Sequence, residues 1–160
     1  MGTMQSIIRL ATIDVAKALV DLRSEFLAEV TANRGEPELV AALTAYFTRA
    51  LKTGEFVAYV AEIDSRIVAT SGMVFHRHPP SPTNLHGCEA YVMNMYTLPA
   101  WRERGIAAAL LGRLIELARQ THCCRVSLHA LPAARSIYVE AGFVPVDTEM
   151  RLDLLNELSD

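Results

Sequence analysis

The feature that most constrains the fold is a stretch in the second half of the chain that runs from an apolar strand pattern into a helix. Residues 88–98 are rich in aliphatic and aromatic side chains, Pro99 interrupts them, and residues 102–104 form a charged turn. A helical pattern then begins on small residues at Gly105 and continues to Gln120. The stretch therefore predicts a strand that leads through a charged turn into a helix.

This turn has the character of an anion site. The first turn of a helix leaves several N–H groups without intrahelical partners, and the helix dipole adds positive potential there. Gly105 and Ala107 keep side chains away from the main chain, and Arg102 and Arg104 add charge. The chain has neither the Gly-Lys-Ser/Thr ending of a P-loop nor a G-x-G-x-x-G fingerprint in a βαβ unit. A phosphate cradle is the favoured interpretation, and an ordinary turn with an exposed basic pair is the alternative.

Two motifs carry a resemblance to a known family. Arg102-x-x-Gly105-x-Ala107 resembles the Q/R-x-x-G-x-G/A signature with which GNAT N-acetyltransferases hold the pyrophosphate of acetyl-CoA. Ala134-x-x-x-Tyr138-x-x-x-Gly142-Phe143 resembles the ending of GNAT domains, at the family's distance from the first motif. One departure is Leu131, which stands where many members carry asparagine. This difference implies one hydrogen bond fewer near the cofactor arm.

The order of the remaining patterns agrees with this resemblance. Strand patterns occupy residues 7–10, 56–63, 66–75, 88–98, 125–130, 143–144 and 149–154, and helical patterns occupy 15–30, 37–53, 105–120 and 132–141. The GNAT resemblance implies an α+β fold layered α/β/α, with a mixed, mostly antiparallel sheet that splays between its fourth and fifth strands. It covers nearly the full chain, so we expect a single domain over residues 1–160.

Composition limits the class of protein and its expected partners and location. The 160 residues are 51% hydrophobic, enough for one compact core, and the net charge of −3 gives no general surface for nucleic acid or anionic membranes. Three cysteines, two of them adjacent, predict reduced thiols rather than a disulfide framework. Without a secretory signal or an apolar run of roughly 18 to 20 residues, we expect a cytoplasmic protein with no membrane partner.

The resemblance implies that acetyl-CoA is the cosubstrate and that main-chain groups bind it. The cradle runs from Arg102 to Ala108, and the splayed strand before it offers backbone groups to the pantetheine arm and the thioester oxygen. An unbroken ladder is the alternative, although Pro99 removes a donor close by. The predicted cofactor-binding residues are Met95, Tyr96, Thr97, Arg102, Glu103, Arg104, Gly105, Ile106, Ala107 and Ala108.

Acetyl transfer also needs an acid for the leaving thiolate and a base for the amine. The resemblance makes Tyr138 the acid. Proton loss to solvent through water is the default; among side chains Glu89 is the first candidate for the base, because it is the only carboxylate on the fourth strand, and Glu149 is the second. His129 is interpreted as a partly buried strand residue rather than a catalyst.

Substrate contacts are expected from three other residues. Tyr91 shares a strand face with Glu89, and Asn94, on the opposite alternation, could orient substrate or water. Phe26 lies on the helical pair that flanks the acceptor pocket in GNAT proteins, as do Arg34, Tyr46 and Phe47. The histidines of the loop 76–87 lack a set of metal-ligand spacings, so no metal is expected and the loop is placed near the acceptor entrance.

The resemblance thus implies an N-acetyltransferase that moves the acetyl group of acetyl-CoA to a primary amine of a small molecule or peptide, by direct attack in a ternary complex. A GNAT-fold module that binds acyl-CoA without catalysis and an unrelated α+β binding protein are the alternatives. The acceptor amine is not specified by the sequence, and a homodimer is left open.

Overall fold

The computed structural model describes residues 5–33 and 35–155, and its elements follow most of the predicted pattern. The strands are β1 (Ile7–Leu10), β2 (Phe56–Ile63), β3 (Arg66–Arg77), β4 (Cys88–Thr97) and β5 (Val126–Ser127). The helices are α1 (Ala16–Val30), α2 (Pro37–Thr53), α3 (Ile106–Gln120) and α4 (Arg135–Glu140). Short 3-10 turns precede three of these helices, η1 (Ile13–Val15), η2 (Pro99–Trp101) and η3 (Pro132–Ala134).

The sheet has the strand order β1-β2-β3-β4-β5 and is antiparallel except between β4 and β5. The parallel pair is short, because it joins only Ala90 to Val126 and Tyr91 to Ser127. From residue 92 onward, β4 has no strand beside it on that edge within the described chain. The expected splay between the fourth and fifth strands is therefore present.

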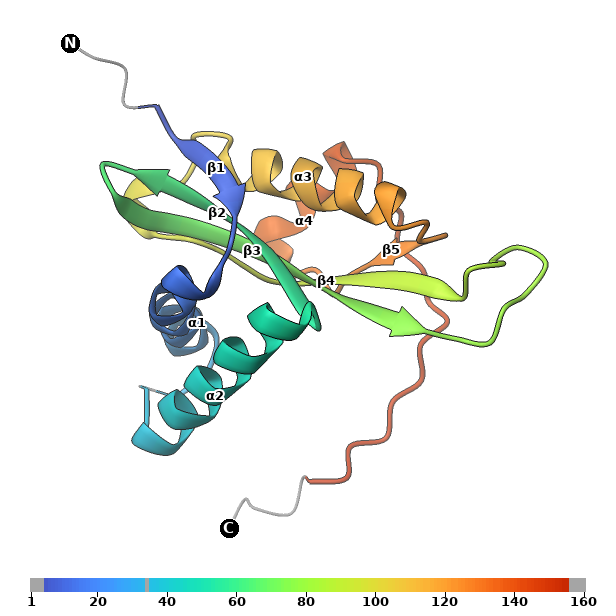
Figure 1. Ribbon diagram of the computed structural model, residues 1–160, viewed down its shortest axis with the longest axis horizontal. Helices are drawn as coiled ribbons and strands as arrows, with labels where there is room; N and C mark the ends of the chain where they lie inside the picture. Colours follow the sequence, from blue (N-terminus) through green and yellow to red (C-terminus); the bar gives the residue numbers. More distant parts are fainter. Residues whose placement is uncertain (1–4, 34, 156–160) are drawn as a thin grey trace.

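Helices cover both faces of the sheet (Figure 1). Alternate residues of β2, Phe56, Ala58 and Val60, are buried against the apolar stripes of α1 and α2. The other face packs against α3, whose Leu110, Leu111 and Leu114 have almost no exposed surface. Burying these stripes, at about 25 cal/mol per Å² of apolar surface, is the main force that holds the layers together. The alternation also fixes which residues of β4 face α3 and which face the opposite side.

Two local features confirm the predicted hairpin of β2 and β3. Asp64 and Ser65 both have positive φ, 49° and 63°, as a two-residue type I′ turn requires. Farther along, Gly72 lies beneath the ring of Phe56, and a Cβ at this position would stand 2.0 Å from the ring carbon Cζ. Only glycine leaves room for that ring, which is 2% exposed.

Three strand and loop predictions need correction. β3 continues to Arg77, because His76 and Arg77 pair with Glu89 and Cys88, so the loop begins two residues later than predicted. β5 contains two residues instead of six, since the strands diverge after Ser127. His129 consequently lies outside the strand, and its side chain is 62% exposed rather than partly buried.

The predicted closing pair of strands, 143–144 and 149–154, is wrong for the described chain. Residues 143–155 form no strand; Glu149 contacts His129 after β5, and the residues beyond it lead away from the body of the protein (Figure 1). Pro145 has no N–H to donate to a ladder. The alternating apolar residues farther along do not lie on a described strand edge, and they are exposed to solvent.

The cysteines carry no disulfide. Cys88 and Cys123 lie with their sulfur atoms 2.7 Å apart, at the start of β4 and just after α3. Burial, followed by the contact with Cys88, raises the pKa of the Cys123 thiol to about 11. Cys123 is therefore held in its unreactive thiol form.

Candidate functional site

The free edge of β4, which begins after Tyr91, contains a kink at Asn94. This residue has a φ of +57°, and the register between β3 and β4 shifts between Thr70 and Gly72 at the same level. The Asn94 side chain is 7% exposed, and neither its nitrogen nor its oxygen has a hydrogen-bond partner among the described residues. A bulge of this kind bends a strand and re-aims its side chains. Here it lies three residues past the last pair with β5.

The turn after β4 delivers the chain to an uncapped helix end. Gly105 is the N-cap of α3 with a φ of +75°, and Glu103 is also left-handed, at +61°. No side chain caps α3, so the N–H groups of its first turn point outward without intrahelical acceptors. A Cβ on Gly105 would meet nothing within 4 Å, and the main chain is accessible there. Ile106 anchors the helix end, because it is only 7% exposed.

Arg102 ties this turn to α1. Its guanidinium donates to both carboxylate oxygens of Glu29, at 2.9 and 3.0 Å, and its Nε donates to the Thr97 carbonyl at 2.9 Å. The Tyr96 hydroxyl donates to the same carboxylate at 2.6 Å, and this bond, followed by Arg102, lowers the pKa of Glu29. Burial, followed by the bond to Glu29, raises the pKa of Tyr96 to about 12.

The second arginine of the turn is also held by the protein. The Arg104 guanidinium lies 4.9 Å from the centre of the Trp101 ring and donates to the Ala100 carbonyl at 3.3 Å. Both arginines thus stabilise the shape of the turn, and the positive charge of Arg102 is balanced by Glu29. The groups left free to meet an anion are the main-chain amides.

Tyr138 reaches β4 from α4. Its side chain is buried, with a residue exposure of 7%, and its hydroxyl donates to the Met95 sulfur at 3.3 Å. The ring packs edge-on against Phe143, with centroids 6.0 Å apart. Burial, with a smaller effect from Tyr91, raises the pKa of Tyr138, so the phenol keeps its proton at neutral pH.

A second cluster joins Tyr91, His129 and Glu149, which come from β4, from the segment after β5 and from the C-terminal segment. The Tyr91 hydroxyl forms a hydrogen bond with His129 Nδ1, and His129 Nε2 lies 2.7 Å from a Glu149 carboxylate oxygen. The ring of His76 stacks on Tyr91, with centroids 6.0 Å apart. Burial, followed by the charge of Glu149, raises the pKa of Tyr91. This series leads from a half-buried phenol to an exposed carboxylate.

Comparison with known proteins identifies the fold and the family. A family model with the description "Acetyltransferase (GNAT) family" matches residues 17–143 of the sequence. The chain belongs to the GNAT acetyltransferase family. No curated protein matched the sequence. The resemblance of the two motifs to GNAT signatures is confirmed at the level of the family.

Solved structures of other GNAT proteins resemble the chain over almost its whole length. A predicted acetyltransferase from Clostridium acetobutylicum, in a crystal structure with acetyl-CoA, is 30% identical, with a TM-score of 0.86 over 97% of this chain and 100% of that one. A GCN5-related N-acetyltransferase from Ralstonia eutropha is 25% identical, with a TM-score of 0.80 over 94% and 99%. Glucosamine-6-phosphate N-acetyltransferase from Arabidopsis thaliana, 16% identical, shares the fold, with a TM-score of 0.72 over 93% and 98%.

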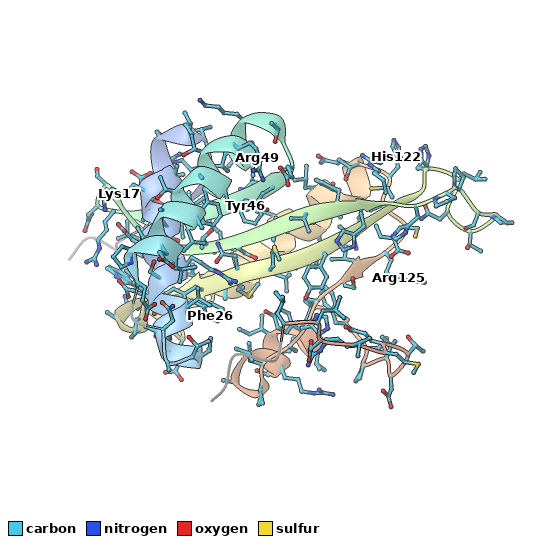
Figure 2. All side chains as sticks on the ribbon, turned by 90° about the horizontal axis from the view of Figure 1, so that it is seen from below. Lys17, Phe26, Tyr46, Arg49, His122 and Arg125 are labelled. Carbon is cyan, nitrogen blue, oxygen red and sulfur yellow. The ribbon has the colours of Figure 1, made fainter. Side chains whose placement is uncertain are left out.

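Within this GNAT fold, Glu89 lies away from Tyr138. Its carboxylate is 3.4 Å from Arg125 and 3.7 Å from His78, next to the start of β4. Met95, which contacts Tyr138, is six residues farther along, or about 20 Å at the usual rise of a strand. Figure 2 shows Arg125 toward the end of the strands opposite to Phe26. Phe26 contacts Tyr96 edge-on, with centroids 6.0 Å apart.

The predicted site residues therefore fall into groups. Tyr91, Met95 and Tyr138 are close to one another, Phe26 joins Tyr96 and Arg102, and Glu89 belongs to neither group. Arg34 lies outside the described residues. Glu29 was missed, because nothing local to its helix marks a carboxylate that pairs with a residue 73 positions away. His129 was noted, but its link to Glu149 depends on the path of the C-terminal segment.

Other possible sites are less suggestive. Within residues 5–33 and 35–155, no group of three or more potential ligands could hold a metal ion. No helix of that same part is long and apolar enough to span a membrane. A groove of about 550 Å³ lies between α1 and the turn that joins β2 to β3, and none of the predicted site residues lines it.

Proposed function

We propose that this chain transfers the acetyl group of acetyl-CoA to a primary amine of a small molecule or peptide, by direct attack in a ternary complex. One observation carries the proposal: the open, uncapped start of α3, the free edge of β4 and the buried hydroxyl of Tyr138 come together at the end of one strand. These are an anion site, a row of unpaired backbone groups and a proton donor. Acetyl transfer from a CoA thioester can use all three.

The main chain is the proposed cofactor site. The amides from Arg102 to Ala108 would bind the pyrophosphate, with Gly105 leaving the approach open. Backbone groups of Met95, Tyr96 and Thr97 would hold the pantetheine arm and polarise the thioester carbonyl, a contribution of about 3 kcal/mol for one well-placed donor. The side chains of Arg102 and Arg104 support this cradle through Glu29 and Trp101.

Tyr138 is the proposed acid. The amine nitrogen attacks the thioester carbon, and the tetrahedral intermediate then collapses as its carbon–sulfur bond breaks. The thiolate of CoA takes the proton of the Tyr138 hydroxyl, which the raised pKa keeps protonated until that step, and the Tyr138 oxygen regains a proton from the acceptor nitrogen, which gives up its second proton on becoming an amide. Met95, the present acceptor of this hydroxyl, is a weak one, so the proton is easily redirected.

For the proton lost by the amine, we favour the route through Tyr91. The Tyr91 oxygen accepts a proton from the ammonium group while its own proton passes to His129 Nδ1. Glu149 stabilises the resulting imidazolium, from which the proton leaves to solvent. Glu89 is the alternative base, and water is the third route. Phe26 and Asn94 are proposed to line the acceptor side, where the unpaired Asn94 amide offers both a donor and an acceptor.

The proposal is tested with the full-length protein and acetyl-CoA. Thermal shift and native mass spectrometry report cofactor binding, and release of free CoA thiol is followed over amino sugars, polyamines, aminoglycosides and peptides with free amino termini. We expect stabilisation by acetyl-CoA and thiol release with at least one of these classes, with a product heavier by one acetyl group. Binding without release for every amine would favour the non-catalytic module, and absence of binding would refute both.

A further inference from the structure

Arg23 of α1 is a half-buried arginine without a carboxylate partner in the described part of the chain. Arg9 and Arg23 are the least exposed of the described arginines. The guanidinium of Arg9 pairs with Glu62 at 2.9 Å and with Asp14 at 3.2 Å. Within residues 5–33 and 35–155, the guanidinium of Arg23 forms no ion pair or hydrogen bond. A desolvated cation needs an anionic partner, and the described chain does not supply one.

The position of Arg23 along the helix places it toward the sheet. Leu19, Arg23 and Phe26 follow one another at helical spacing on one side of α1. Leu19 has no exposed surface and belongs to the same cluster as Phe47 and Phe56, so this side of α1 faces the sheet and α2. The groove between α1 and the turn that joins β2 to β3 is lined by other residues of the helix. Arg23 therefore lies away from that groove.

Two aromatic rings connect Arg23 to the free edge of β4. The guanidinium carbon of Arg23 lies 5.3 Å from the centre of the Phe26 ring, and this ring packs edge-on against Tyr96. Tyr96 is adjacent to Met95, whose sulfur accepts the hydroxyl of Tyr138. Arg23 is thus two ring contacts away from the backbone groups that are proposed to polarise the thioester carbonyl.

The face of β4 on this side of the sheet is partly uncovered. Val74 of β3 packs against the cluster beneath α1 and α2, and its partner on β4 is Tyr91, so both residues face this side. Met93, two residues farther along, faces the same side and is 36% exposed. An acceptor on this face would lie between Tyr91, the proposed acceptor of the amine proton, and Arg23.

One guanidinium on this side is left without a counter-charge. Arg102 is balanced by Glu29, and Arg49 on α2 pairs with Glu55. Burial lowers the pKa of Arg23, but a guanidinium remains charged at neutral pH. Its planar fork of N–H donors matches the two oxygens of a carboxylate. A carboxylate carries one negative charge, whereas a phosphate monoester carries about −1.5 to −2 at pH 7, which is more than one arginine balances.

We propose that the acceptor amine carries a free carboxylate, as amino acids do, and that Arg23 binds this carboxylate while the amine faces Tyr91 and the thioester. This inference rests on the proposed acetyl transfer and names its acceptor class. The Phe26 ring supports the guanidinium through a cation–π contact, and partial burial strengthens its charge-assisted hydrogen bonds. Polyamines and aminoglycosides would instead bring further positive charge toward Arg23, which is unfavourable.

The first test compares matched acceptors with the wild-type protein. Thiol release from acetyl-CoA is measured with α-amino acids and with ω-amino acids of increasing length, each paired with its primary amide. Glucosamine and glucosamine 6-phosphate form a further pair. We expect kcat/KM for the best amino acid to exceed that for its amide by about tenfold or more, because the amide loses a charge-assisted pair.

The outcomes of this test separate the acceptor class from the reaction itself. Thiol release that is as fast with the amides, or fastest with glucosamine 6-phosphate or an amine without an acidic group, overturns the carboxylate assignment while acetyl transfer stands. Absence of thiol release with every amine overturns the proposed function and this inference together.

The second test removes the guanidinium. Arg23→Gln is expected to lower kcat/KM for the amino acid by about tenfold or more and to leave kcat/KM for its amide within about threefold. The two amines differ in basicity, but both enzymes meet the same pair, so this difference cancels in the comparison. Arg49→Gln is the matched control, because that guanidinium also lies over an aromatic ring, 5.6 Å from the centre of Tyr46, but has Glu55 as its partner.

Folding and cofactor binding are measured separately from acceptor selection. Far-UV circular dichroism and acetyl-CoA affinity by calorimetry should be unchanged in Arg23→Gln. Arg23→Lys keeps the charge without the planar fork and should retain part of the preference for the amino acid. An equal loss for the amino acid and its amide, or an unchanged ratio between them in both Arg23 variants, shows that Arg23 supports only the packing of α1 and overturns the proposal.

Discussion

The Arg102 guanidinium and the Glu29 carboxylate, 73 residues apart, form two hydrogen bonds that fasten the turn before α3 to the end of α1. An ion pair of two half-exposed groups contributes only about 0–1 kcal/mol. The larger effect comes through Tyr96, whose hydroxyl donates to the same carboxylate from a residue that is 5% exposed. Leaving such a hydroxyl unpaired costs about 1–3 kcal/mol.

Glu29→Ala is therefore expected to lower the free energy of unfolding by about 1–3 kcal/mol at pH 7, measured by urea denaturation. Glu25→Ala, one turn earlier on α1 and also exposed, is the control and changes it by less than about 0.5 kcal/mol. A loss no larger than that of the control would show that Tyr96 does not depend on Glu29.

The effect of Glu29 has a defined pH dependence. The folded protein lowers the pKa of this carboxyl below 4.5, mainly through the bond from Tyr96. The stabilisation is fully present above pH 4.5 and is lost as the pH falls through the lower folded pKa. The difference in unfolding free energy between wild type and Glu29→Ala is thus expected to shrink on acidification below that pH.

Gly105→Ala tests the cradle, and the chain contains its own control. Gly105 and Gly54 have the same φ of +75° with ψ of 5° and 8°, and a Cβ on either meets nothing within 4 Å. Each alanine variant should lose about 1–2 kcal/mol of stability from backbone strain. Only Gly105→Ala should weaken acetyl-CoA binding, by about tenfold or more, as measured by calorimetry. Equal affinities for the two variants would count against the cradle.

The sequence predicted those parts of the fold that depend on periodicity over many residues. The apolar stripes of α1, α2 and α3 and the hairpin turn at Asp64 and Ser65 were predicted because local spacing and turn chemistry decide them. The motif around Gly105 was found for the same reason, since a short backbone pattern fixes its conformation. The length of β5 could not be predicted in this way, because it depends on the point at which β5 and β4 diverge.

Contacts between distant segments were beyond the sequence. The partners of Glu29 are 67 and 73 residues away, and the position of Glu89 among Arg125 and His78 depends on the register of three strands and a loop. The alternation of Met150, Leu152 and Leu154 predicted a strand that the structure does not contain, because these residues pair with no other strand in the described part of the chain. A strand pattern shows which face of a segment is apolar, but it does not identify the surface that covers that face.

Tyr138→Phe is expected to lower kcat at least about tenfold while leaving acetyl-CoA affinity within about twofold. The ring of phenylalanine keeps the packing against Phe143, and only the proton donor is removed. Thiol release at saturating substrate measures the first quantity and calorimetry the second. Tyr59→Phe, the same change on β2, is the control. A fully active Tyr138→Phe variant would remove this hydroxyl from the mechanism.

Replacing two further glycines with alanine is expected to change the stability of the protein in opposite directions. Gly72→Ala places a methyl group 2.0 Å from the Phe56 ring and should cost about 1–3 kcal/mol or more. Gly112 is exposed within α3 with nothing within 4 Å of a Cβ, so Gly112→Ala should add about 0.5–1 kcal/mol. Urea denaturation of both variants checks the packing of β3 against β2. Similar effects of the same sign would contradict this packing.

His129→Gln tests the route by which the amine loses its proton. This imidazole contacts Tyr91 on β4 and Glu149 in the C-terminal segment. Tyr91 in turn stacks on the ring of His76 and lies close enough to Tyr138 to affect its pKa. Glutamine keeps a polar side chain at this position but cannot take up the proton that Tyr91 passes on. We expect His129→Gln to lower kcat by about tenfold or more, with acetyl-CoA affinity unchanged.

Two glutamine variants decide which carboxylate matters to this step. Glu149→Gln keeps a polar partner beside His129 but removes the charge that stabilises the imidazolium. We therefore expect it to lower kcat, by less than His129→Gln does. Glu89→Gln should leave kcat close to wild type, because Arg125 and His78 hold that carboxylate away from Tyr138. A larger loss for Glu89→Gln than for His129→Gln would assign the base to Glu89 instead, and an unchanged kcat for all three variants would leave water as the acceptor of the proton.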